Sequence, residues 1–147
     1  SAPPRTAHWQ AEAALLFEKG LAEEFAFRRK RGGHLFSKMR LLVAQWDAYL
    51  TDNLWLRNAA PANAMAQQVA AGLAAIPGVT LLHPVVANEL FPNLPEIVVE
   101  ELKHDGFRFY DHGGGTIRLV CAFNTRATDV DAFIAAAECH AHSGDTE

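Results

Sequence analysis

The chain has 147 residues, of which half are hydrophobic and a fifth are charged, and its net charge is −4. This length suits one compact domain, and this composition excludes a disordered or fibrous chain. Because no apolar run approaches the roughly 20 residues that span a bilayer and no signal sequence is visible, we expect a soluble, cytoplasmic protein without a membrane partner.

The first predicted elements follow a proline-rich start. Residues 1–10 are predicted to be a disordered linker. The apolar segment 11–18 has no helical stripe, which predicts a strand over Glu12–Phe17. From Leu21 a helix is predicted, with acidic residues early and basic residues late, as the helix dipole favours. The pair Gly32–Gly33 is expected to end this helix.

Two longer helices are predicted next. The spacing of apolar residues predicts a helix with one wide apolar face over Leu35–Tyr49. The segment Thr51–Asn53 is expected to cap a further helix that reaches about Ile76. Pro61 lies inside that helix and cannot donate a hydrogen bond to the Arg57 carbonyl, so a kink or a break is expected there.

In the second half of the chain, the sequence predicts short strands and two helices. Proline at position 92 is expected to confine its strand to a sheet edge or to end it. The predicted strands are Val79–Leu82, Glu89–Leu94, Phe107–Tyr110 and Thr116–Cys121. The predicted helices are Pro95–Asp105, with Ile97, Val98 and Leu102 inside, and Thr128–Cys139, with Val130, Phe133, Ile134 and Ala137 inward.

This order of elements predicts an α+β fold. We expect a small, mostly antiparallel sheet of about four strands, with helices packed on one side and long helices before it. The tail, residues 141–147, is predicted to be disordered.

Three motifs that invite a functional reading favour a structural one. The run Gly113–Gly115 has neither a following Lys-Ser/Thr nor a following helix, so a hairpin turn is predicted rather than a phosphate-binding loop. Cys139, His140 and His142 are close in sequence but lie where order is expected to end, so no metal site is predicted. With Cys121, the cysteines are too few for a disulfide scaffold and are expected to be buried or idle thiols.

Arg118 is a cation within an apolar strand, where burial without a partner is costly. Alternation along this strand puts Thr116 and Val120 on the same face as Arg118, and Ile117 and Leu119 on the other. Two interpretations remain open: an exposed strand arginine, or a clamp that binds a carboxylate through two guanidinium N–H groups.

The basic residues are concentrated near the N-terminus. Residues 1–40 have a net charge of +4 and residues 41–147 of −8, and six Lys/Arg fall within Arg28–Arg40 with no acid among them. Three interpretations remain open: a solvated, charge-compensated helix end, a small phosphate site built from Lys30, Arg31 and Lys38, or a polyanion surface. Because the rest of the chain is acidic, a small anion is a better partner than nucleic acid.

Several strings of residues resemble one family. They are Phe25–Arg40, Gln45–Leu50, Ala62–Ala66, Leu73–Val79 and Ile117–Val120, in this order. Together they resemble the low-specificity L-threonine aldolase family, which consists of pyridoxal-phosphate enzymes of the aspartate-aminotransferase-like fold. The resemblance covers about residues 11–139. It implies that 11–18 is the last strand of the large cofactor domain and that 19–140 is the C-terminal small domain.

The resemblance also implies roles for particular residues. The family's arginine that matches Arg118 binds the substrate carboxylate, and basic residues that match Lys30 and Lys38 lie near the cofactor phosphate. The family's Schiff-base lysine lies in a stretch that here reads Pro4–Trp9, without a lysine. Arginine does not deprotonate to form an aldimine. The resemblance therefore implies no catalytic residue in this chain and no covalently bound pyridoxal phosphate.

Two functions follow from this resemblance. The first is the C-terminal domain of a pyridoxal-phosphate-dependent C–C lyase that converts threonine to glycine and acetaldehyde, inactive alone because the lysine and most of the cofactor site are absent. The alternative is a non-enzymatic interaction or oligomerisation module derived from the same fold. Both predict association, as a homo-oligomer or with the missing large domain, because the N-terminal apolar residues would otherwise be exposed. An amino-acid substrate is expected only in the complete enzyme.

Overall fold

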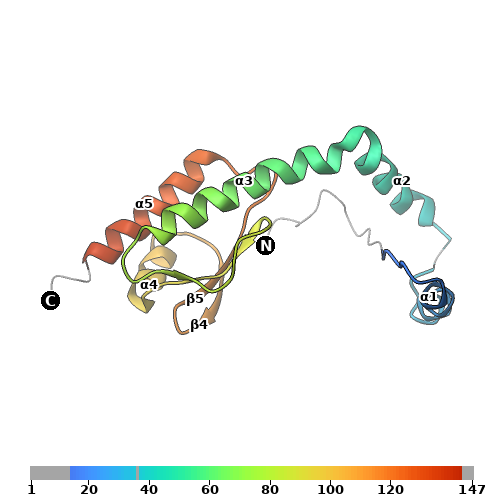
Figure 1. Cartoon of the computed structure of the whole chain (residues 1–147), viewed down its shortest axis with the longest axis horizontal. Coiled ribbons are helices and arrows are strands. Elements are labelled where there is room, and N and C mark those ends of the chain that lie inside the picture. Colours follow the sequence, from blue (N-terminus) through green and yellow to red (C-terminus); the bar gives the residue numbers. More distant parts are fainter. Residues whose placement is uncertain (1–13, 36, 144–147) are drawn as a thin grey trace. The chain divides into compact units, whose positions relative to one another are not determined.

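The computed structural model describes residues 14–35 and 37–143, and most of its helices and strands are labelled in Figure 1. The chain divides into two units with a boundary between Trp55 and Leu56. The first unit holds helices. The second unit holds a small sheet with helices on it. The predicted linker, residues 1–10, lies outside the described residues.

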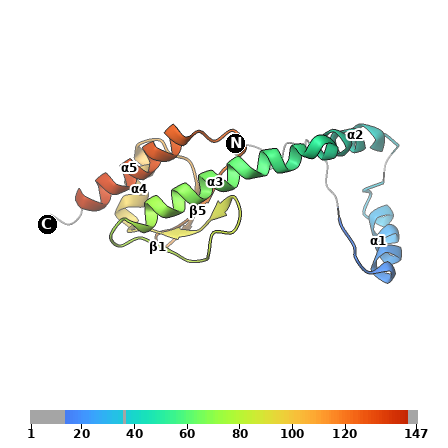
Figure 2. The same cartoon turned by 45° about the horizontal axis from the view of Figure 1, so that its top comes forward.

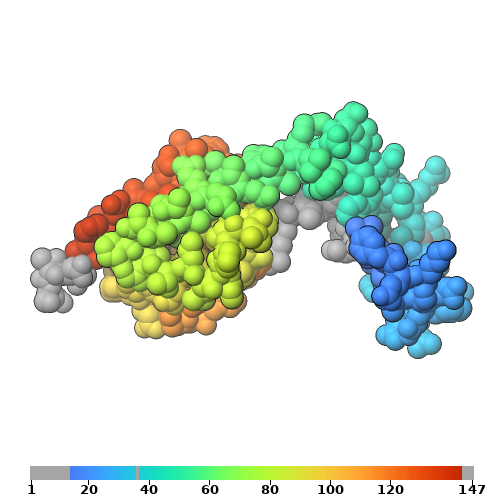
Figure 3. Space-filling view, viewed as in Figure 1, coloured from blue at the N-terminus to red at the C-terminus, as the bar shows by residue number. Residues whose placement is uncertain are grey.

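The N-terminal unit consists of α1 (Lys19–Arg31), α2 (Met39–Leu50) and a 3-10 turn, η1 (Thr51–Asn53). As predicted, α1 carries its basic residues in the last turn and ends at Gly32, followed by Gly33 with a φ of 74°. None of the described side chains in these three elements is buried. The blue atoms of α1 are open to view in Figure 3. Its described residues therefore give this unit no core of its own.

Two predictions for this unit are wrong. Ala14–Phe17 is not a strand, because a strand needs a hydrogen-bonded neighbour and no described strand pairs with this segment. The other residues of that predicted strand lie outside the described residues. The second helix begins at Met39 rather than Leu35, because Lys38 before it has a non-helical backbone, with φ −99° and ψ 22°.

Helix α3 (Leu54–Ala74) is continuous through Pro61, which excludes a break, one of the two predicted outcomes there. Proline removes only its own hydrogen bond, and the other bonds of this 21-residue helix remain. The turn before it takes the place of the predicted cap, since Asp52 and Asn53 adopt left-handed φ values of 50° and 56°, which these residue types tolerate.

Two further helices complete the C-terminal unit: α4 (Glu96–His104) and α5 (Ala127–Ser143). Figures 1 and 2 show α3 and α5 side by side. Gln68 on α3 donates a hydrogen bond to Asp131 on α5 at 2.7 Å. The tail prediction is wrong for residues 141–143, which continue α5. The His142 and Ser143 side chains form hydrogen bonds with the backbone carbonyls of Glu138 and Cys139, one turn earlier. These bonds satisfy carbonyl groups that have no backbone partner at the end of a helix.

The sheet is antiparallel at every described pairing. Strand β5 is central: β2 and β3 pair along one of its edges in a single continuous register, β4 pairs along the other edge, and β1 pairs with β3. The strands are β1 (Thr80–Leu81), β2 (Glu89–Leu90), β3 (Pro92–Asn93), β4 (Tyr110–Gly113) and β5 (Thr116–Val120). The predicted α+β fold, a small antiparallel sheet with helices on one side, is confirmed.

Three details of the sheet differ from the prediction. The predicted strand Glu89–Leu94 is split at Phe91, and its second part, β3, pairs with both β1 and β5, so Pro92 does not lie at an edge. A two-residue strand with few ladder bonds accommodates the missing donor of proline. The strand predicted over Phe107–Tyr110 is wrong in its bounds: β4 begins at Tyr110 and continues to Gly113, because a bulge between Asp111 and Gly113 lets these residues pair with β5.

One apolar core joins the helices to the sheet in the C-terminal unit. Leu73 on α3, Leu102 on α4, Ile117 on β5 and Ala137 on α5 are all fully buried. The prediction that Ile97 faces inward is wrong, since its side chain is 57% exposed. The buried face of α4 is formed by residues 98, 99 and 102, and residue 97 lies outside this face.

Candidate functional site

The strands of the C-terminal unit alternate between a core face and an outer face. Leu90, Pro92 and Leu94 are buried in the core, as is Ile117 on β5. Side chains between them therefore belong to the outer face. The register places Tyr110 opposite Arg118 and Glu89 opposite Val120. Three polar side chains from three strands thus share the outer face: Glu89 from β2, Tyr110 from β4 and Arg118 from β5.

The Arg118 guanidinium lies between the other two side chains. Its Nε donates a hydrogen bond to Glu89 Oε1, with which it also forms an ion pair. Its central carbon lies over the Tyr110 ring, 5.3 Å from the ring centroid. The Arg118 side chain is only 12% exposed, so the interpretation as an exposed strand arginine is wrong. A guanidinium this deeply buried requires such partners.

Arg118 keeps one binding edge for a ligand. Among the described residues, its two terminal nitrogens have no hydrogen-bond partner, because Glu89 contacts Nε. Two parallel N–H donors on a planar guanidinium match the two oxygens of a carboxylate. Low solvent exposure strengthens such a contact, since less water screens the charges. Chemically, this site is suited to bind one small carboxylate.

Sequence reasoning identified Arg118 but missed Glu89 and Tyr110. Alternation alone puts Glu89 on the polar face of its strand. Its partner, however, lies 29 residues further along the chain. Only the pairing of β2 with β5 brings these two side chains together, and that register is not visible in the sequence.

The turn before β5 fixes the start of this strand. A hairpin turn is present as predicted, but it consists of Gly114 and Gly115, because Gly113 belongs to β4. All three glycines have a positive φ. Asn93 Nδ2 donates hydrogen bonds to the Gly114 carbonyl at 2.8 Å and to Thr116 Oγ1 at 3.0 Å. The Leu94 amide donates to the Gly115 carbonyl at 2.9 Å. These contacts hold β5 in the register that places Arg118 between its partners.

The two predicted phosphate-binding lysines lie in the N-terminal unit. Lys30 is in the last turn of α1, and Lys38 directly precedes α2. Both are exposed. No contact joins them in the part of the chain that the structure describes. The Lys30 charge lies at the C-terminal end of a helix, where a cation is favourable without any ligand.

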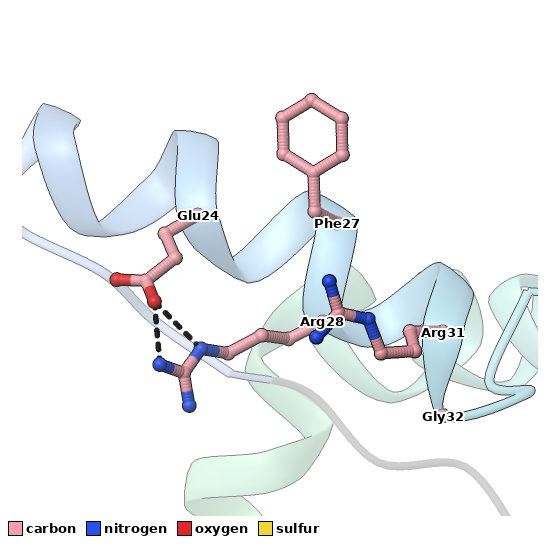
Figure 4. Close-up of a pocket in the computed structure, with 5 residues that line it drawn as sticks. All are labelled: Glu24, Phe27, Arg28, Arg31 and Gly32. Carbon is pink, nitrogen blue, oxygen red and sulfur yellow. Dashed lines mark hydrogen bonds and ion pairs between the residues drawn. The ribbon is translucent and has the colours of Figure 1, made fainter.

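A shallow, open hollow of about 470 Å³ lies beside α1 and is lined by Glu24, Phe27, Arg28, Arg31 and Gly32 (Figure 4). Arg28 is paired with Glu24 through both Nε and a terminal nitrogen. An anion here would meet the Glu24 carboxylate, which reduces the local positive charge. The geometry thus supports a charge-compensated helix end at this point.

The C-terminal unit does not fit covalent attachment of pyridoxal phosphate. Its single lysine is Lys103. Lys103 Nζ lies 2.6 Å from carboxylate oxygens of Asp111 and of Glu100. The hydrogen bond to Asp111 raises the pKa of Lys103, and the hydrogen bond to Glu100 raises it to a smaller degree. The hydrogen bond between Lys103 and Asp111 also lowers the pKa of Asp111. A lysine that stays protonated is not a nucleophile, so we assign no step through the cofactor to these residues.

The histidines and cysteines have structural positions. His140 on α5 lies 2.8 Å from Asp105, the residue that caps α4. Cys121 is buried, which raises the pKa of its thiol, whereas Cys139 is exposed. Within residues 14–35 and 37–143, no three metal-binding side chains come together. No described helix is both long and apolar enough to cross a membrane.

Comparison with known proteins gives consistent matches. A low-specificity L-threonine aldolase of a Pseudomonas species is 45% identical over 120 residues, which are 81% of this chain and 35% of that protein. Another, from Pseudomonas aeruginosa, is 45% identical over 115 residues, 78% of this chain and 33% of that protein. This chain therefore spans about a third of the length of these curated relatives. No family model matches it.

Solved structures agree with these matches. A threonine aldolase of Leishmania major covers 77% of this chain, with a TM-score of 0.65 and 29% identity, and 34% of that protein is matched. A glycine decarboxylase (P-protein) of the glycine cleavage system covers 71% of this chain, with a TM-score of 0.56 and 22% identity, and 26% of it is matched. The second likeness supports the fold alone.

Proposed function

We propose a function on the premise that this chain is a homologue of the low-specificity L-threonine aldolases, matching a partial C-terminal domain of them, as its sequence predicted. The chain supplies the part of a threonine-aldolase-type lyase that binds the substrate carboxylate. The observation that carries this proposal is the largely buried Arg118, whose terminal nitrogens have no partner among the described residues.

The chemistry of the substrate class supports this role. Threonine and glycine both carry an α-carboxylate, which forms two parallel hydrogen bonds with a guanidinium. Holding that carboxylate fixes the orientation of the rest of the amino acid, which is the positioning that a lyase requires. Lys30 and Lys38 are proposed as weaker contacts to a cofactor phosphate, on the basis of their charge and of the family resemblance.

The proposed activity is incomplete in these residues. Lys103 is ion-paired to two carboxylates, and the segment Pro4–Trp9 contains no lysine. We therefore propose that the 147 residues bind an amino-acid carboxylate but do not cleave threonine alone. The reactive lysine and the rest of the cofactor site would come from other residues.

Binding of glycine tests this proposal. In a titration followed by NMR, glycine is expected to shift the Arg118 side-chain resonances, whereas glycinamide, which lacks the carboxylate, does not. The variant Arg118→Lys keeps the charge but loses the two-pronged contact, so its glycine affinity should fall roughly tenfold. Arg108→Lys, an exposed position, is the matched control and should bind like the wild type. Equal binding of glycine and glycinamide contradicts the proposal.

A second candidate function is self-association through the N-terminal unit. No described side chain of α1 or α2 is buried, and Phe17, Phe27 and Leu41 are 96%, 73% and 66% exposed. Such apolar surface marks an interaction site. The net charges of +4 over 1–40 and −8 over 41–147 favour a second copy of this chain as the partner, since opposite charges attract.

Light scattering at micromolar concentration tests self-association. The expected mass is at least twice the 16.1 kDa of one chain. Replacing Phe27 and Leu41 with aspartate should shift the mass toward the monomer, because a charge is costly to bury in an apolar interface. The control is Ile97→Asp, compared with each single aspartate variant, because it places one such charge on an exposed apolar position of the C-terminal unit. A monomeric wild type contradicts self-association.

A further inference from the structure

The guanidinium of Arg118 has three surfaces through which it makes contacts, and two of them are occupied by residues of this chain. The Nε edge donates to Glu89, and the central carbon lies over the Tyr110 ring. The edge formed by the two terminal nitrogens is the third. The hydrogen bond and the ring contact do not compete, because Glu89 contacts only Nε and the Tyr110 ring lies against the central carbon.

We propose that Glu89 and Tyr110 are positioning residues, which hold Arg118 so that its terminal nitrogens meet the carboxylate of the ligand. This inference rests on the proposed function. Glu89 fixes rotation of the guanidinium within its plane, and Tyr110 fixes the tilt of that plane. Neither residue needs to touch the ligand.

The location of these two residues supports the assignment. Tyr110 is directly opposite Arg118 in the β4–β5 pairing, and Glu89 projects from β2 on the opposite side of β5. The arginine is therefore held from both neighbouring strands. A long side chain loses much conformational freedom when it binds a ligand, and holding it in advance removes part of that cost.

The negative charge of Glu89 suggests a second role, competition with the ligand for Arg118, and the two roles predict opposite effects when Glu89 is removed. A carboxylate so near Arg118 also repels a second carboxylate, so the alternative role for Glu89 is that of a competitor for the arginine. If it were a competitor, its removal would strengthen ligand binding. If it positions the guanidinium, its removal weakens binding although one repulsive charge is lost.

Two variants of Glu89 distinguish these roles. Glu89→Gln keeps an oxygen that accepts the Nε hydrogen bond and loses the charge, so glycine affinity should equal or exceed that of the wild type. Glu89→Ala loses the acceptor, and glycine affinity should fall roughly fivefold. Tyr110→Leu should also weaken binding, whereas Tyr110→Phe keeps the ring face and is the matched control.

The Nε–H resonance of Arg118 provides a readout that a general loss of stability would not change in this way. In the folded 147-residue chain this proton should exchange slowly in the wild type and in Glu89→Gln, and fast in Glu89→Ala, while the amide spectrum of the core stays the same. Slow exchange in Glu89→Ala, or glycine affinity that is unchanged or higher in that variant, overturns the inference. No response of wild-type Arg118 to glycine overturns the proposed function and, with it, the inference. Failure of the two proposals is thus distinguishable.

Discussion

Replacing Gly115 with alanine is expected to destabilise the folded chain by about 3 kcal/mol. Gly115 is buried and has a φ of 77°, a conformation that strains any residue with a Cβ atom. A Cβ atom there would also overlap with the carbonyl oxygen of Leu94, which is rigid backbone. Because this turn sets the start of β5, the strand would have to move. Urea denaturation followed by circular dichroism measures the loss.

Gly113→Ala is the matched control for that measurement. Its φ of 82° brings the same backbone strain, but no atom lies near the position of its Cβ. The expected loss is therefore only about 1 kcal/mol. Equal losses for the two variants would show that steric overlap with Leu94 does not contribute.

Leu102→Ala is the second substitution with a large expected effect. Leu102 is fully buried in the core that α4 shares with α5 and the sheet, and truncation there leaves a cavity as well as removing apolar contact. Buried leucines of this kind lose about 2–5 kcal/mol on truncation to alanine. The midpoint of urea unfolding should fall accordingly, with little change in slope.

Ile97→Ala on the same helix provides the comparison. Ile97 is 57% exposed, so the loss should stay below about 1 kcal/mol. A comparable loss at both positions would contradict the placement of Ile97 outside the core. The sequence predicts that both Ile97 and Leu102 face the core. The difference between the two losses therefore tests that prediction for Ile97.

Local rules predicted the ends of two helices, α1 and α4, well. The basic last turn and Gly32 place the end of α1, and Pro95 and Gly106 flank α4, because these signals act within one or two turns of a helix. The interior position of Pro92 and the burial of residue 99 rather than 97 depend on neighbouring strands and helices. Such contacts between distant segments override local propensity.

The candidate site shows the same division. A cation among apolar strand residues is visible in the sequence, which is why Arg118 was identified. Its burial and its contacts with Glu89 and Tyr110 depend on the register of three strands. The roles predicted for Lys30 and Lys38 came from the family resemblance, and they stay predictions.

Strand β5 carries the fully buried Ile117 and the candidate ligand residue Arg118 next to each other, on opposite faces. The same strand therefore contributes to the free energy of folding, through Ile117, and to the free energy of ligand binding, through Arg118. A ligand that binds only the folded chain stabilises it, by about 0.4 kcal/mol at a concentration equal to its Kd. Conversely, a core substitution that raises the unfolded fraction lowers the apparent affinity in proportion, without altering any group that the ligand touches.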